Sequence, residues 1–124
     1  MRIDKNDIPV VMAVPGATAR QLPFGGDLAA EYFSLGAGTD IAPLLQGLEG
    51  DACQAPHWGY VITGALTVTY TDAKTDRCVG GDCFYWPAGH SVRVDEDADV
   101  ILFSPFHAHA AVLDHMKAKL ASMS

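Results

Sequence analysis

The most constraining feature of the chain is a succession of short segments rich in β-branched and aromatic residues between Trp58 and Phe103, separated by polar or glycine-containing turns. Residues of this kind favour pleated, half-buried strands, and strands at this spacing are typical of an all-β sandwich or barrel. The expected strands are residues 58–63, 65–70, 77–79, 83–86, 91–95 and 100–103, with an acidic turn before the last.

The segments before this region predict further extended structure. Proline and glycine interrupt residues 1–26, which we expect to form short extended pieces and turns, and residues 28–35 read as a strand. Residues 40–50 leave helix and loop open, because their leucines have helical spacing whereas Pro43 and Gly47 favour a loop.

The C-terminal segment predicts one amphipathic helix. Ser104 is a suitable N-cap and Pro105 suits the first helical position. An apolar stripe at helical spacing follows, made of Val112, Leu113, Met116 and Leu120. This helix should cover a barrel mouth or the flank of a sheet.

With 124 residues, the chain has the size of a single domain. We divide it into an N-terminal extended arm of the same domain (1–27), a barrel (28–105) and the C-terminal helix (106–124).

The composition argues against several kinds of partner. Eight basic residues against fifteen acidic ones give a net charge of -7, and the basic residues are scattered, so nucleic acid is a poor partner. No apolar run approaches the roughly twenty residues that span a bilayer, and the first ten residues do not resemble a secretory leader. We therefore expect a cytoplasmic protein without a membrane partner, with its three cysteines reduced.

Two separated motifs give the chain a family resemblance. Gly81, Pro87 and Gly89 have the spacing of the second signature motif of the cupins, G-x5-P-x-G-x2-H-x3-N, and residues 60–64 (YVITG) resemble the end of the first. The chain therefore resembles the cupin superfamily from about residue 28 to residue 105, most closely a subgroup of small, uncharacterised bacterial proteins. The resemblance implies an all-β fold, the double-stranded β-helix or jelly-roll barrel, here with a C-terminal α-helix.

The motif positions that carry metal ligands in cupins are mostly changed in this chain. Aligning Gly64 places His57 where the family has Glu and, with the shorter spacer, Cys53 and Asp51 where it has two His. The longer spacer would give Ala52 and Gly50, which cannot ligate. In the second motif Val92 occupies the His position, and His90 lies two residues earlier.

These positions suggest a metal site. If the two motif strands face each other as in other cupins, Cys53, His57 and His90 converge, with Asp51 or water as a fourth ligand. A thiolate with imidazoles favours Zn²⁺, although iron or another divalent ion also fits. Val92 and Tyr85 are expected to line the ligand pocket.

Other interpretations of the same residues stay open. Cysteine often packs as a small hydrophobe, and a histidine in a barrel can simply satisfy hydrogen bonds. Cys53 could be a nucleophile only if its pKa were depressed. His107 and His109 should face nearly opposite sides of the helix and so not chelate together, and His115 is expected at the surface.

Two functions are compatible with this pattern. One is a cupin whose pocket binds a divalent metal and binds or acts on a small polar molecule. The other is a metal-free module that binds a small ligand without catalysis. In both cases the resemblance implies a homodimer formed through the N-terminal strands.

Overall fold

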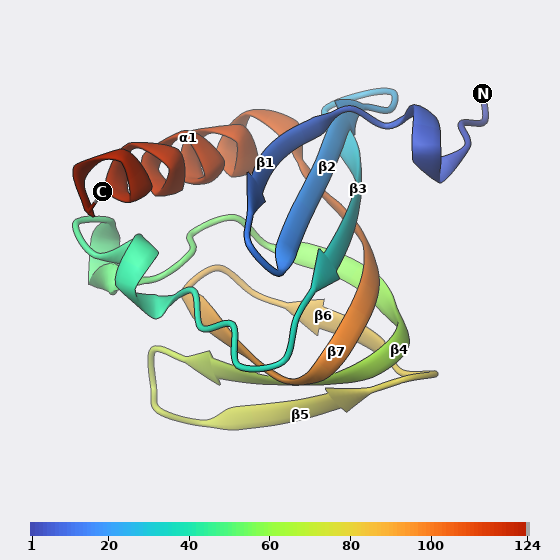
Figure 1. Cartoon of the computed structure of the whole chain (residues 1–124). Coiled ribbons are helices and arrows are strands. Elements are labelled where there is room, and N and C mark those ends of the chain that lie inside the picture. The colour runs from blue at the N-terminus through green and yellow to red at the C-terminus, as the bar shows by residue number, and fades with distance from the viewer. Residues whose placement is uncertain (124) are drawn as a thin grey trace.

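Strands dominate the computed structural model, which describes residues 1–123 (Figure 1). The elements are η1 (Lys5–Asp7), β1 (Val10–Val14), β2 (Ala17–Pro23), β3 (Leu28–Leu35), η2 (Ala42–Leu45), η3 (Glu49–Asp51), β4 (His57–Tyr70), β5 (Thr75–Val79), β6 (Cys83–Trp86), β7 (His90–Pro105) and α1 (Phe106–Met123). This confirms the prediction of an all-β jelly-roll barrel with a C-terminal helix. The last residue of the predicted helix, Ser124, lies outside the described residues.

The two longest strands, β4 and β7, hold the barrel together. The strands follow the order β1-β2-β3-β7-β4-β5, and β6 pairs with the first residues of β4. Because β7 pairs with β3 through its C-terminal half and with β4 along most of its length, it joins the N-terminal strands to the rest of the sheet. Residues 1–27, expected as an extended arm, contribute β1 and β2 to this sheet.

Strands β4 and β7 correct two expectations. Residues 57–70 are one strand, β4, where the sequence predicted separate strands at 58–63 and 65–70. The sequence predicted separate strands at 91–95 and 100–103 with an acidic turn between them, but residues 90–105 are one strand. Even-numbered positions are buried on both sides of the acidic segment, and only Glu96 interrupts the pattern. The pairing with β4 shifts register near this point, so the chain bulges and bends without leaving the sheet.

Apolar side chains form two adjacent clusters. The first fills the barrel and consists of Val61, Leu66, Val68, Cys78, Trp86, Val92, Val94, Ala98, Val100 and Leu102. The second lies between α1 and the segment before β4, and consists of Leu45, Cys53, Ala55, Val112, Leu113 and Met116. Residues 40–50, left open between helix and loop, form the short helical turns η2 and η3.

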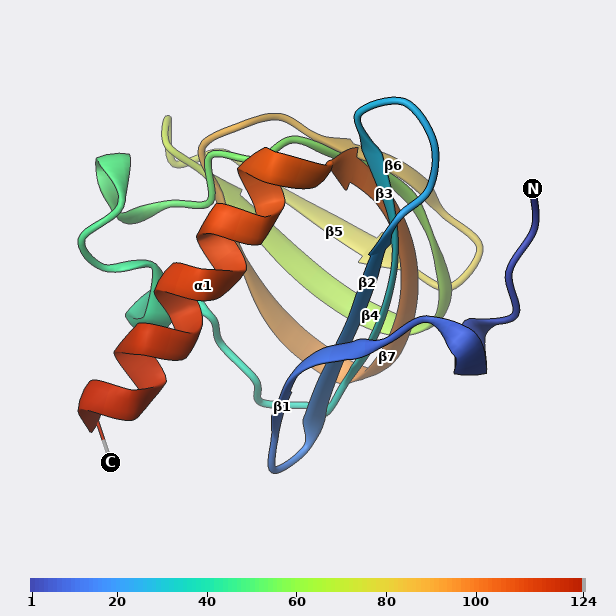
Figure 2. The same ribbon diagram turned by 90° about the horizontal axis from the view of Figure 1, so that it is seen from above.

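Helix α1 lies beside the curved sheet on its open side (Figure 2). It begins at Phe106, whose N–H donates to the Asp27 carbonyl at 2.8 Å. Ser104 is therefore not the N-cap that the sequence suggested, because β7 continues through Pro105 and buries the serine side chain. No helix within residues 1–123 is long and apolar enough to cross a membrane.

Gly64 allows β4 and β7 to approach closely at the bulge. Its φ is 91°, in the left-handed region, and a Cβ built there would lie 2.1 Å from the Asp97 carbonyl oxygen. Any other residue would push the strands apart. Gly81, in the turn before β6, has a similar φ of 97°, but a Cβ there would meet nothing within 4 Å.

Substituting these two glycines therefore distinguishes the cost of a strained backbone from the cost of a steric clash. We expect Gly81→Ala to lower the free energy of unfolding by about 1 kcal/mol, the cost of the left-handed backbone. Gly64→Ala should cost at least about 2 kcal/mol more, because the methyl group also displaces β7. Urea unfolding of both variants measures this difference, and equal losses would contradict the close contact.

Candidate functional site

A cavity of about 70 Å³ lies between the barrel interior and α1. Residues from β1, β2, β3, β4 and β7 line one part of it, and Val112, Leu113 and Met116 of α1 line another. Its polar lining residues are Thr18, Cys53, His57, His90 and His109. Four of these five are cysteine or histidine, so the cavity brings possible metal ligands beside an apolar wall.

Cys53 is held in place by the backbone of β7. Its N–H donates to the His90 carbonyl at 2.8 Å, and the His90 N–H donates back at 3.2 Å. His57, the first residue of β4, is buried, and its Nε2 lies 3.6 Å from the Cys53 Sγ. The structure thus brings Cys53, His57 and His90 to one cavity.

The third member of the closest group comes from α1. Cys53, His57 and His109 each offer a ligand atom, and the three atoms lie within 4.8 Å of one another. The ring centroids of His57 and His109 are 4.3 Å apart. The sequence interpretation set His109 aside because it cannot pair with His107, but it precedes Val112, Leu113 and Met116 at helical spacing. That extension of the buried stripe was the signal that could have identified it.

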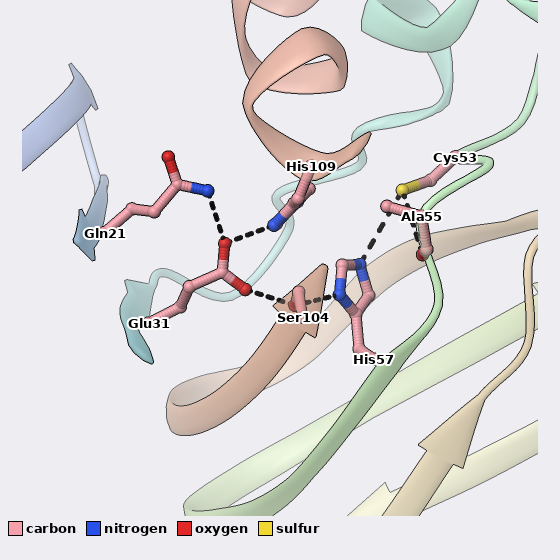
Figure 3. A network of polar contacts seen from close by, with 7 residues as sticks. All are labelled: Gln21, Glu31, Cys53, Ala55, His57, Ser104 and His109. Atoms are coloured by element: carbon pink, nitrogen blue, oxygen red, sulfur yellow. Dashed lines mark hydrogen bonds and ion pairs between the residues drawn. The ribbon is translucent and has the colours of Figure 1, made fainter. Parts of the chain in front are cut away.

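Behind these three side chains lies a fully buried carboxylate, that of Glu31 on β3 (Figure 3). Its Oε2 accepts a hydrogen bond from the Gln21 side chain at 2.8 Å and another from the His109 Nδ1. Its Oε1 accepts from the Ser104 hydroxyl. The Ser104 Oγ in turn lies 2.6 Å from the His57 Nδ1. One carboxylate therefore connects β2, β3, β7 and α1 and also orients both imidazoles.

This network fixes the tautomer of each ring. Because Ser104 uses its only hydrogen toward Glu31, the His57 Nδ1 must carry a hydrogen and donate it to the Ser104 Oγ. The His109 Nδ1 likewise donates to a carboxylate, which only accepts. The His90 Nδ1 donates to the Pro87 carbonyl at 2.8 Å. Each ring in its neutral form is therefore left with a lone pair on Nε2, the form that binds metals.

Burial keeps His57, His90 and Cys53 in their uncharged forms. Burial, followed by the nearby His109 and His90, holds the pKa of His57 well below its usual range. Burial also lowers the pKa of His90 to about 4, against the opposing effect of its bond to Pro87. Burial raises the pKa of the Cys53 thiol to about 11, so without a metal it is protonated at neutral pH. This is the reverse of what a nucleophilic cysteine needs.

The structure does not bring all predicted site residues together. His90 lies beside the cluster, with its ring centroid 4.9 Å from that of His57, and Val92 lines the cavity. Asp51 is exposed in η3, where its Oδ1 accepts from the Gly47 N–H at 2.9 Å, so it does not reach the cluster. Tyr85 is 53% exposed and stacks on Trp58 outside the barrel, because alternation along β6 sends Trp86 inward instead.

Comparison with known proteins identifies the fold. No family model and no curated protein matches the sequence. Among solved structures, an RmlC-like cupin from Shewanella frigidimarina is 18% identical, with 83% of this chain and 88% of that chain covered and a TM-score of 0.59. The polyketide cyclase RemF from Streptomyces resistomycificus is 17% identical, with 85% and 78% covered and a TM-score of 0.59. Ectoine synthase from P. lautus is 13% identical, with 83% and 71% covered and a TM-score of 0.57.

These similarities, together with the strand topology, show that the chain is a small protein with the cupin fold. Because the sequence identities are so low, these similarities establish the fold and no activity or ligand. The buried Cys53, His57 and His109 group could hold a metal ion.

The buried neutral histidines predict acid sensitivity of the metal-free protein. An unfolded histidine binds a proton near pH 6.5, whereas native His90 does so only near pH 4, so stability present above pH 6.5 is lost as the pH falls between these values. The free energy of unfolding should fall by up to about 1.4 kcal/mol per pH unit for this one group.

Urea unfolding at pH 7, 6 and 5 in the presence of a chelator measures this slope. We expect the free energy of unfolding to change less steeply with pH in His90→Asn than in wild type. In His107→Asn, which changes an exposed histidine, it should change as in wild type. Identical slopes for all three proteins would contradict a buried, neutral His90.

Proposed function

We propose that this protein is a cupin whose barrel cavity holds a divalent metal ion and binds or acts on a small molecule. The metal ligands would be Cys53, His57 and His109, and Zn²⁺ is favoured over iron or another divalent ion because the set combines a thiolate with imidazoles. Relative to the sequence interpretation, His109 takes the place of Asp51. His90, beside the group, is then a further ligand or a contact to the bound molecule.

The arrangement of lone pairs is the observation that carries this proposal. Hydrogen bonds through Nδ1 leave the Nε2 lone pairs of His57 and His109 available to a metal ion, while the buried Glu31 carboxylate lies behind both rings. Metal-binding histidines usually donate their other ring N–H to such a partner, which raises the basicity of the ligand. The high pKa of the Cys53 thiol also fits, because a metal ion replaces the thiol proton.

The chemistry of the site would follow from this ligand set. A bound divalent metal supplies Lewis acidity toward a carbonyl or hydroxyl oxygen, or toward a water molecule. The protein's own contribution is to orient the ligands through Glu31 and Ser104 and to exclude bulk water with α1. His90, with its free Nε2, can accept a hydrogen bond from a bound molecule.

A metal-free binding module is the second candidate. It is favoured by the two acceptors beside the Cys53 thiol, the Ala55 carbonyl at 3.7 Å and the His57 Nε2 at 3.6 Å, because the thiol can donate to either of them without any metal. The same cavity would then hold a small ligand by shape and by hydrogen bonds to the histidines. The two candidates differ in one measurable property, the metal content.

Metal binding is tested with untagged protein. We expect purified protein to carry close to one equivalent of zinc, and the cobalt-substituted protein to show thiolate-to-cobalt charge-transfer absorption. Cys53→Ser should remove that absorption, and His109→Gln should weaken metal affinity at least about tenfold.

The control is His107→Gln, which changes an exposed histidine two residues away on the same helix and should bind like wild type. Equal metal affinity in the His109 and His107 variants would exclude His109 as a ligand. Folded protein that takes up neither zinc nor cobalt would leave the metal-free module as the function.

We also propose that the protein is a cytoplasmic homodimer with no nucleic-acid partner. Strand β1 ends the order of the sheet, and Val10 on it is exposed, so the N-terminal strands offer an edge to a second copy. Light scattering at micromolar concentration should give the mass of a dimer. We expect Val10→Asp to weaken the dimer. Tyr60→Asp, which changes an exposed residue of β4, should leave the dimer intact. A monomer, or dissociation by Tyr60→Asp alone, would contradict this interface.

A further inference from the structure

We infer that the cavity accepts a compact, uncharged molecule with an apolar body and one polar group that faces the cysteine and histidine cluster. This rests on the proposed function, since it takes the cavity as the ligand site. It replaces the polar ligand expected from the sequence with a different chemical class. The residues that line the cavity, the tautomers of its histidines and its volume each support this ligand class.

The walls of the cavity are overwhelmingly apolar. Side chains from the barrel meet side chains from α1 across it, among them Phe33, Leu66, Val92, Val100, Leu102 and Met116. A ligand that covers these surfaces gains the free energy of removing apolar area from water, about 25 cal/mol per Å². A polar body would instead lose hydrogen bonds to water that the walls cannot replace.

No charged side chain that could pair with a charged ligand lines the cavity. Among the described residues, its lining contains no lysine, arginine, aspartate or glutamate. Glu31 lies outside the lining, and its oxygens already accept from Gln21, Ser104 and His109. Burying an ammonium group there is costly because it has no anionic partner. A carboxylate or phosphate could pair only with the bound metal ion, whose two positive charges are already balanced by the Cys53 thiolate and the Glu31 carboxylate. The ligand is therefore uncharged.

The polar end of the cavity suits a single small polar group. Cys53, His57, His90 and His109 gather there, and the three rings present Nε2 lone pairs. A hydroxyl group can donate to such a lone pair and can also offer its own oxygen to a metal ion. The ligand class is therefore a small alcohol or a related molecule with one neutral polar head.

The size of the cavity limits the body of the ligand. Its volume of about 70 Å³ is roughly half that of the ~150 Å³ apolar cavity that holds benzene in an engineered protein. This favours a compact, branched molecule over an extended chain or a fused ring system.

The methionines allow a direct test with small probes. Met12 and Met116 line the cavity, whereas Met1 and Met123 are exposed and serve as internal controls. In protein labelled with ¹³C at the methionine methyl groups, isobutanol should shift the Met12 and Met116 signals saturably and leave the other two in place. Isobutyrate and isobutylammonium share the branched body but carry a charge, and should bind at least about tenfold more weakly.

The methionine methyl shifts are measured in zinc-loaded and in chelator-treated protein, and the zinc content of each sample is measured separately. Selective shifts with isobutanol alone support the inference. Equal or stronger shifts with either charged probe would overturn the inference. The absence of isobutanol shifts in zinc-loaded protein would also overturn it, but that outcome would leave the proposed metal site intact. Isobutanol shifts in folded protein that binds no zinc would overturn the metal proposal and support the ligand class.

A second variant locates the binding. Val92→Phe fills part of the cavity and should abolish the isobutanol response at Met116 while the protein stays folded by circular dichroism. An unchanged response in the folded variant would overturn the assignment to this cavity. If the variant does not fold, the wild-type comparison of the three probes decides the question.

Discussion

The buried carboxylate of Glu31 is the interaction on which the site depends. Taking a carboxylate out of water costs several kcal/mol unless donors surround it. Here Gln21 from β2, Ser104 from β7 and His109 from α1 all donate to it, so the four elements must meet for the charge to be satisfied. The same requirement places α1 beside the barrel and fixes where its first turns lie.

This requirement also determines the chemistry of the cavity. With Ser104 committed to Glu31, His57 has one permitted tautomer, and His109 is fixed in the same way. Two imidazoles thus expose the nitrogen that can ligate or accept, next to a thiol that burial keeps protonated. The Glu31 carboxylate lies behind the imidazoles, outside the cavity, and no acidic or basic side chain among the described residues lines the cavity itself. Metal binding and an apolar ligand are compatible for this reason.

Much of the fold could be predicted because it follows from local patterns. The strands β3, β5 and β6 fall close to the expected segments, and Gly64, Gly81 and Gly89 take positive φ at positions where the motif spacing placed glycine. The errors occurred where tertiary pairing overrides a local signal. An acidic segment suggested a turn, but pairing with β4 keeps it in β7, and the same strand absorbs Ser104, which looked like a helix cap.

The sequence alone predicted an all-β sandwich or barrel and the C-terminal helix, because strand alternation and helical spacing are local properties of the chain. The resemblance of its two motifs to those of the cupins implied that Cys53, His57 and His90 lie near one another. The sequence could not determine which residues join them. His109 reaches the cavity only because α1 packs on the barrel, and Asp51 points away only because η3 turns it outward. The position of His109 depends on satisfying one buried charge among residues 10 to 78 positions apart, information that no local pattern contains.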